Sequence, residues 1–253
     1  MKKWRTLILR LHPVTWSQVV RAVLAGLTMA LLTPNRIGEN FSRVFILPKE
    51  KRVAAVGLSG VNTLAQIVII QLGGILGFLM LINNDQFIDI LHTSIGWFTL
   101  TLGLIISAVI VLLYFNINRV IPLINRWKIV KKHLESLKIL NSLDNRLKWR
   151  VLAFAFLKYI VYTFQFYLLL NYFGVDIAWH TCIPAIMTIY VLLTYLPVIS
   201  IGEAGVRGSV TLLIIGQFSD ASLSILASSF GLWAINIVIP AVTGSFLMPR
   251  VKF

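Results

Sequence analysis

Residues 53–82 read VAAVGLSGVNTLAQIVIIQLGGILGFLMLI, a run of 30 that contains no Asp, Glu, Lys, Arg or His. At about 1.5 Å of rise per residue, a helix of this length exceeds the roughly 30 Å of a bilayer's hydrocarbon core. The whole chain has the same character, because 58% of its 253 residues are hydrophobic and only 13% are charged. These features predict a membrane protein, since soluble domains are only about 45–50% apolar.

Three further runs predict membrane-crossing helices. Thr93–Asn118 and Ala221–Pro249 contain no charged residue, and Val151–Phe173 contains one, Lys158. Each is long enough to cross the hydrocarbon core as a helix. The predicted fold class is therefore an all-α polytopic membrane protein with about four full transmembrane helices.

The net charge of +14 is distributed unevenly along the chain. Two segments between hydrophobic runs, Asn83–Leu91 and Gly174–Trp179, contain Asp but no Lys or Arg. This asymmetry is typical of the positive-inside rule. We therefore expect the basic clusters to face the cytoplasm and contact anionic lipid headgroups, and we expect no nucleic-acid partner. Eighteen of the 23 Lys and Arg fall in the first ten residues, Lys49–Arg52, Arg119–Arg150 and the final PRVKF.

If the four basic clusters share one side, the chain crosses the membrane an even number of times between consecutive clusters. Between the last two clusters, the full spans Val151–Phe173 and Ala221–Pro249 already give two crossings. The intervening segment Thr181–Phe218 must then enter and leave by one face, as a re-entrant hairpin. The same count makes Trp16–Leu47 a second re-entrant hairpin. Each hairpin is predicted to turn at a proline, Pro34 or Pro197.

The two hairpins are predicted to open to opposite sides of the membrane, and a full span follows each of them. This pattern is an inverted-topology repeat, which in transporters places the binding site near the bilayer midplane. We expect one integral membrane domain over residues 1–253, with repeat one at about 11–115 and repeat two at about 151–249. A cytoplasmic amphipathic linker at about 116–150 joins them, and both termini are expected in the cytoplasm.

The two predicted turns carry similar sequences, IGENFSR at 37–43 and IGEAGVR at 201–207. Each places a Glu four residues before an Arg, Glu39 with Arg43 and Glu203 with Arg207, so one helical turn allows them to pair. A charge inside a bilayer costs from about 3 to more than 10 kcal/mol and is commonly functional. The alternative is that both are interfacial ion pairs that anchor loops.

We predict that these residues line a central polar cavity that binds the substrate. A guanidinium donates forked hydrogen bonds to a phosphate, and a carboxylate binds a cationic headgroup or takes up a proton. The glycine beside each Glu lets a second backbone or a lipid headgroup approach closely. The other predicted substrate-binding residues are Pro34, Asn35, Arg36, Gly38, Lys158, Pro197 and Gly202.

Other polar and small residues have structural interpretations. The amides Asn62, Gln66 and Gln71 predict hydrogen bonds between helices. The spacing of Gly73 and Gly77 predicts close helix packing. The aromatic residues between 149 and 179, among them Tyr159 and Tyr172, are interpreted as mainly lipid-facing or interfacial.

The sequence offers little for enzyme chemistry. The four His are scattered without ligand spacing, and there is neither a phosphate-binding loop nor a dinucleotide fingerprint. Cys182 is the only cysteine, which excludes an intrachain disulfide. We therefore expect no enzyme activity, no metal site and no cofactor.

Two stretches, TPNRIGENFSR at 33–43 and YLPVISIGEAGVRGS at 195–209, resemble the transmembrane, flippase-like region of lysylphosphatidylglycerol synthases. The resemblance covers the chain from about Trp4 onward and corresponds to a stand-alone form without the cytosolic synthase domain. It implies an inner-membrane protein that moves a lipid between leaflets. In two-domain members that lipid is an aminoacylated phosphatidylglycerol. The chain departs from the family at 203 and 208, where relatives usually have Gly and Glu.

Residues and resemblance together predict a lipid flippase or scramblase-like transporter. Its substrate would be a phospholipid or a related anionic or aminoacylated lipid. The alternative is a non-transporting membrane subunit that scaffolds a lipid- or glycan-modifying enzyme. Membrane lipids are the expected partners, and a membrane enzyme or a second copy of the chain are the further ones. The expected location is the inner (plasma) membrane, which the chain would cross several times.

Overall fold

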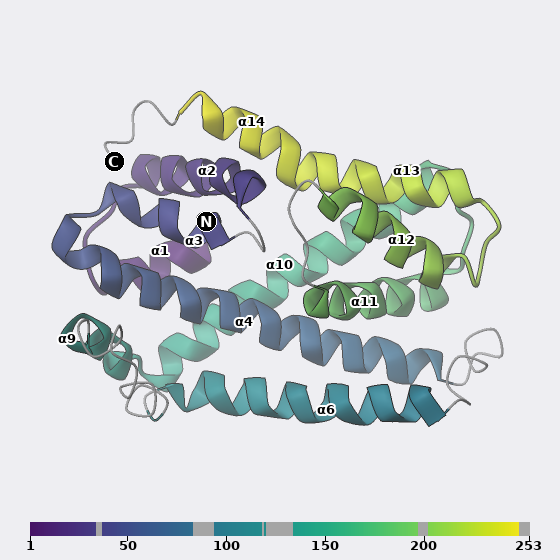
Figure 1. Cartoon of the computed structure of the whole chain (residues 1–253), viewed down its shortest axis with the longest axis horizontal. Coiled ribbons are helices and arrows are strands. Elements are labelled where there is room, and N and C mark those ends of the chain that lie inside the picture. The colour runs from purple at the N-terminus through teal and green to yellow at the C-terminus, as the bar shows by residue number, and fades with distance from the viewer. Residues whose placement is uncertain (34–36, 83–93, 118, 120–133, 197–201, 248–253) are drawn as a thin grey trace. The chain divides into compact units, whose positions relative to one another are not determined.

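The computed structural model describes residues 1–33, 37–82, 94–117, 119, 134–196 and 202–247, and this part of the chain is helical without strands (Figure 1). In chain order the elements are α1 (Lys2–Ile8), α2 (Trp16–Leu32), α3 (Ile37–Arg43), the 3₁₀ turn η2 (Val44–Ile46), α4 (Lys49–Leu81), α6 (Ser94–Phe115), α9 (Leu134–Leu137), the 3₁₀ turn η3 (Lys138–Ser142), α10 (Asn145–Tyr172), α11 (Trp179–Tyr195), α12 (Glu203–Ile215), α13 (Ser222–Trp233), the π-helical turn η5 (Ala234–Val238) and α14 (Ile239–Ser245).

Three helical stretches of the described part are long and apolar enough to cross a membrane: Lys49–Leu81, Asn145–Tyr172 and Ser222–Ser245. They match three of the four predicted spans. The fourth, Thr93–Asn118, is helical from Ser94 to Phe115. The all-helical membrane architecture is therefore confirmed.

The outward faces of these helices are apolar. On α10, the large side chains of Phe156, Leu157, Val161 and Phe164 are each more than half exposed. Contiguous apolar surface of this kind is unfavourable in water, whereas lipid tails cover it without cost. The exposed face of α10 is thus a lipid-facing surface.

The chain forms two compact units. Unit 1 comprises Met1–Gln66, Ile110–Phe156 and Ile237–Phe253, and unit 2 comprises Ile67–Val109 and Leu157–Asn236. Each unit contains one of the two Glu–Arg motifs.

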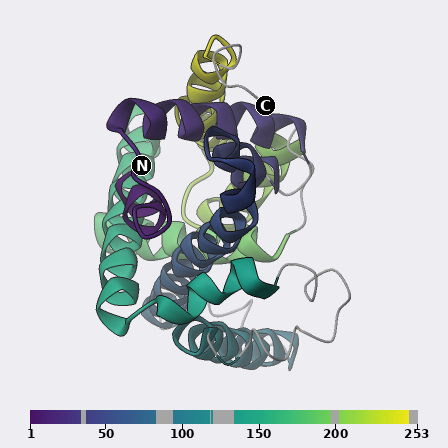
Figure 2. The same cartoon turned by 90° about the vertical axis from the view of Figure 1, so that its left-hand side faces the viewer.

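In unit 1, α2 begins with a capping box, because Thr15 and Gln18 satisfy each other's backbone N–H groups. The helix then lies against both α3 and α14 (Figures 1 and 2). Small residues permit the contact with α14, since a Cβ at Gly244 would lie 2.5 Å from Thr28 Oγ1. That hydroxyl also donates to the Ala241 carbonyl at 2.7 Å.

In unit 2, α12 contacts both α11 and α13 (Figure 1). The GxxxG segment of α4 packs closely, as predicted. A Cβ at Gly77 would lie 2.6 Å from the Pro184 carbonyl oxygen of α11. Gly73 makes a similar approach to Tyr159 of α10.

Two predicted features lie wholly or partly outside the described residues. Pro34, Asn35, Arg36 and Pro197 are outside them, as is most of the predicted amphipathic linker. Within that linker the structure describes α9, η3 and the start of α10.

Candidate functional site

The Glu39–Arg43 pair lies in α3, which follows α2 in unit 1. Arg43 Nη2 donates a hydrogen bond to Glu39 Oε1 across one helical turn, and the two side chains form an ion pair. The Arg43 side chain is 9% exposed and the Glu39 side chain 23%. The glycine at position 26 of α2 allows α3 to pack closely here, because a Cβ on Gly26 would lie 3.0 Å from Arg43 Cγ and 2.9 Å from the Glu39 carbonyl oxygen.

A chain of hydrogen bonds fixes the start of α3 against the end of α2. The Gly38 N–H donates to Thr33 Oγ1 at 2.8 Å, and this hydroxyl donates to the Met29 carbonyl at 2.9 Å. A Cβ at Gly38 would lie 2.6 Å from both oxygens, which is closer than packing allows. The predicted close backbone approach is thus confirmed at Gly38, and it fixes the position of Glu39.

The Glu203–Arg207 pair opens α12 in unit 2. Arg207 Nη2 lies 3.1 Å from Glu203 Oε1, and the side chains are 16% and 13% exposed, respectively. Glu203 is in the first turn, where the partial positive charge of the helix N-terminus favours a carboxylate. The predicted pairing four residues apart is therefore confirmed in both motifs.

Gly202 differs from Gly38 in its surroundings. Among the described residues, no atom lies within 4 Å of a Cβ placed on Gly202. A close approach to another described segment therefore does not explain this glycine.

Each arginine also keeps a buried donor that its Glu does not use. In the described part of the chain, the Nε atoms of Arg43 and Arg207 are buried without a hydrogen-bond partner. An unsatisfied buried donor costs about 1–3 kcal/mol, and more when it is charged. Among the described residues, each guanidinium therefore retains one N–H donor that no acceptor oxygen uses.

A cluster of tyrosines accompanies the second pair. Tyr190 of α11 lies near Arg207, and its hydroxyl donates to the Tyr162 carbonyl at 3.0 Å. The rings of Tyr190 and Tyr159 are 5.8 Å apart between centroids. Tyr159 is only 6% exposed, and Gly73 leaves the space that its hydroxyl occupies. The interpretation of Tyr159 as lipid-facing is therefore wrong, whereas Tyr172, 82% exposed, is consistent with it.

Gln71 connects three helices of unit 2. Its Oε1 accepts hydrogen bonds from Ser107 Oγ of α6 at 3.0 Å and from the Tyr195 hydroxyl at 2.7 Å. Tyr195 is the last residue of α11, so Gln71 fixes the end of the helix that leads to the second motif. The predicted role of Gln71 in hydrogen bonding between helices is confirmed. Sequence patterns give no sign of Tyr195 or Ser107, which contact Gln71 only through tertiary folding.

Lys158 lies on the exposed face of α10, with its ammonium 4.9 Å from the centroid of the Tyr162 ring. This placement is a cation–π contact on the lipid-facing surface. The structure describes seven of the predicted site residues: Lys158, the four ion-pair residues, Gly38 and Gly202. Within the described residues, no three His, Cys, Asp or Glu side chains are grouped as a metal ion would require.

A comparison with protein families agrees with this picture. Residues 1–244 match the model of the lysylphosphatidylglycerol synthase transmembrane (TM) region. The match covers nearly all of the 253 residues, and a cytosolic synthase domain is not evident among them. No curated protein and no solved structure matches the chain significantly.

Proposed function

The chain belongs to the family of lysylphosphatidylglycerol synthase transmembrane regions, and from this membership we propose that it moves a lipid between membrane leaflets. The observation that carries the proposal is the occurrence of two largely buried Glu–Arg pairs, one in each unit, on helices with the same motif. A charged side chain inside a membrane is energetically unfavourable, so charged residues found there commonly have a function such as substrate binding.

The chemistry of the two pairs suits a phospholipid headgroup. Each guanidinium, of Arg43 and of Arg207, donates to its Glu through Nη2, which leaves other N–H groups that can bind a phosphate oxygen. Glu39 and Glu203 can receive the amino group of a zwitterionic or aminoacylated lipid. The substrate class is thus a phospholipid or a related anionic or aminoacylated lipid, which passes through a polar path without enzymatic conversion.

The helix lengths support re-entrant hairpins. α11 has 17 residues and α12 has 13, so at about 1.5 Å per residue they reach roughly 25 and 20 Å. Both fall short of a hydrocarbon core of about 30 Å. We propose that α2–α3 and α11–α12 enter the bilayer from opposite faces as an inverted repeat. The protein would then lie in the inner membrane with both termini and its basic clusters in the cytoplasm, against anionic headgroups.

The test is transbilayer movement of fluorescent phosphatidylglycerol in proteoliposomes. We expect Arg207→Ala and Arg43→Ala each to slow transport about tenfold or more, since a charge-assisted hydrogen bond contributes roughly 1.5–3 kcal/mol. Arg21→Gln is the matched control, because Arg21 is an exposed cation on α2. Equal rates in the wild type and the Arg43→Ala, Arg207→Ala double variant would reject the assignment of these residues.

A charge swap separates transport from the alternative of a structural ion pair. The Glu203→Arg, Arg207→Glu double variant retains an ion pair one turn apart but moves the guanidinium. If the pair only anchors α12, the swap restores both thermal stability and transport relative to Arg207→Ala. We expect partial recovery of stability, because an Arg at 203 opposes the helix dipole, and no recovery of transport, because phosphate binding depends on the position of Arg207.

The family's link to lipid synthesis favours a second candidate, a non-transporting subunit that scaffolds a lipid- or glycan-modifying enzyme. Such a subunit would purify together with the enzyme or with a second copy of itself. When it is reconstituted alone, lipids would exchange between leaflets at the same rate as in liposomes without protein.

A further inference from the structure

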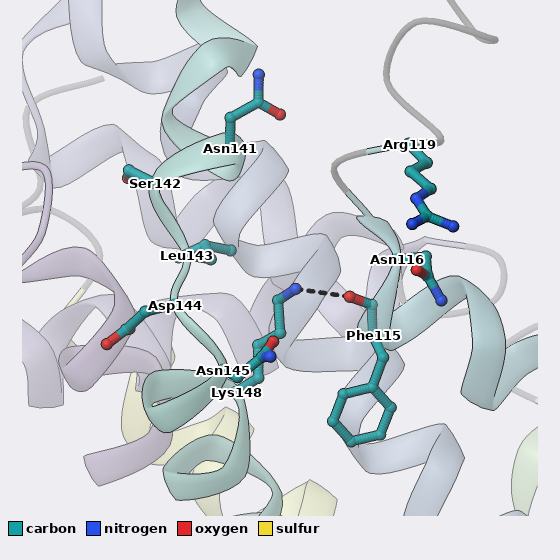
Figure 3. A pocket seen from close by; sticks show the side chains of 9 residues that line it. All are labelled: Phe115, Asn116, Arg119, Asn141, Ser142, Leu143, Asp144, Asn145 and Lys148. Carbon is teal, nitrogen blue, oxygen red and sulfur yellow. Dashed lines mark hydrogen bonds between the residues drawn. The ribbon is translucent and has the colours of Figure 1, made fainter.

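A polar cavity of about 430 Å³ lies in unit 1 where the end of α6 meets the start of α10 (Figure 3). It is separate in sequence from the residues of both Glu–Arg motifs and plays no part in the proposed transport path. It is lined by Phe115, Asn116, Arg119, Asn141, Ser142, Leu143, Asp144, Asn145 and Lys148.

Lys148 is the central residue of this cavity. It is only 3% exposed, and its ammonium donates a hydrogen bond to the Phe115 carbonyl at 2.7 Å. The Tyr114 hydroxyl in turn donates to the Lys148 carbonyl at 2.8 Å. These two bonds join α6 to α10 and fix the lysine side chain in place. The ammonium has three donors, so the carbonyl does not saturate it.

Among the described residues, no carboxylate forms an ion pair with this buried ammonium. Asp144, one turn earlier, instead accepts a hydrogen bond from the Leu147 N–H and lies 3.8 Å from Arg10. Figure 3 shows its carboxylate turned away from the ammonium. Burying an uncompensated ammonium is unfavourable, which points to an anion in the cavity.

The other wall adds a second cation and neutral donors. Arg119 stands on the side of the cavity opposite α10, above Asn116 (Figure 3). A guanidinium and an ammonium together can hold a tetrahedral phosphate, and the asparagine amides can donate to its remaining oxygens.

The location matches the depth of lipid headgroups. α10 is one of the membrane-crossing helices, and the cavity lies at its first turn. Trp149 is 62% exposed there and its ring centroid is 5.2 Å from that of Phe115. Exposed tryptophan at the end of a transmembrane helix is typical of the membrane–water interface.

We infer that this cavity binds one phosphate-bearing anion, held by Lys148 and Arg119. The phosphate belongs either to an anionic phospholipid of the adjacent leaflet or to a free phosphate ion. The inference does not depend on transport through the Glu–Arg pairs.

The test is a lipid titration of the purified full chain in detergent, followed by native mass spectrometry. The probes are phosphatidylglycerol, phosphatidylcholine and inorganic phosphate. We expect Lys148→Gln and Arg119→Gln each to weaken binding of phosphatidylglycerol about tenfold, which corresponds to 1.4 kcal/mol. The matched control is Arg146→Gln, because Arg146 is exposed on the same helical turn but does not line the cavity. It should change the affinity less than twofold.

Two variants keep the result interpretable. Lys148 also joins α6 to α10, so Lys148→Gln alone could act through folding, whereas Arg119 is exposed and its replacement leaves that joint intact. Displacement of phosphatidylglycerol by millimolar phosphate would identify a free anion as an occupant, and resistance to it would identify the lipid. Affinities of Lys148→Gln and Arg119→Gln that match the wild type, both for phosphatidylglycerol and for inorganic phosphate, would overturn the inference.

Discussion

Gly38 and Gly202 occupy the same position in their motifs but have different surroundings. At Gly38 the α2 backbone lies so close that a Cβ would be 2.6 Å from the Met29 carbonyl oxygen. At Gly202 the described part of the chain leaves open space within 4 Å. The same Gly→Ala substitution at these two positions therefore compares a tightly packed environment with an open one.

We expect Gly38→Ala to lower the free energy of unfolding by about 1–3 kcal/mol, because overpacking forces the backbone of α2 or α3 to shift. Gly202→Ala should change it by less than about 0.5 kcal/mol. The measurement is thermal unfolding in detergent, followed by circular dichroism. Equal midpoints for the two variants would contradict the tight α2–α3 packing.

Sequence reasoning at the residue scale succeeded where the contact is local. The ion pairs of Arg43 and Arg207 follow from spacing alone, because residues four apart are neighbours on any helix. The hydrogen bond from Tyr195 to Gln71 joins residues 124 positions apart, and no periodicity predicts such a partner. For the same reason the buried position of Tyr159 was missed.

At the scale of elements, the long apolar runs predicted the helices well. A long uncharged segment in lipid must pair its backbone N–H and C=O groups internally, and a helix does this within one segment. The C-terminal run shows what a composition argument misses. Within Ser222–Ser245 the helix widens into a π-helical turn at Ala234–Val238. Pro240 lies two residues after this turn, and its ring and missing N–H disturb the hydrogen bond to residue 236. A π turn at this place is the local accommodation.

Asn236, within the π turn, contributes a contact between helices. Its Nδ2 donates to Gln165 Oε1 of α10 at 3.0 Å and also to the Leu232 carbonyl at 3.0 Å. A double-mutant cycle with Asn236→Ala and Gln165→Ala should give a coupling energy of roughly 0.5–2 kcal/mol, as for other hydrogen bonds between membrane helices. Unfolding of the four proteins in mixed micelles supplies the data. A coupling near zero would mean that the Leu232 carbonyl alone satisfies Asn236.

At the scale of the whole molecule, segregated charge carries the most information. The basic clusters fixed the predicted orientation, and the parity of crossings between them required two hairpins. Helices α2 and α3 fall within the first predicted segment, and α12 with all but the first two residues of α11 falls within the second. The division of the chain into two interleaved units did not follow from the sequence, because α4 and α10 each contribute residues to both units.

Orientation is testable with single cysteines, because the native Cys182 is buried and can be replaced by Ala. Ser142 and Ser222 are both exposed, so Ser→Cys changes at these positions are matched and mild. We expect an impermeant thiol reagent to label Ser142→Cys only from the cytoplasmic side and Ser222→Cys only from the opposite side. Labelling of both from one side would reject the predicted orientation.

A third cysteine tests whether the second hairpin is re-entrant. Gly202 precedes α12 and has open space for a side chain, so Gly202→Cys reports on the turn without disturbing the packing of described residues. If α11 and α12 each crossed the membrane, this cysteine would react from the cytoplasmic side as fast as Ser142→Cys. Because helices of roughly 20–25 Å stop within the hydrocarbon core, we expect it to react more slowly than either surface position. Its protection by added phosphatidylglycerol, absent with phosphatidylcholine, would further connect the turn of the hairpin to the lipid path proposed for Arg207.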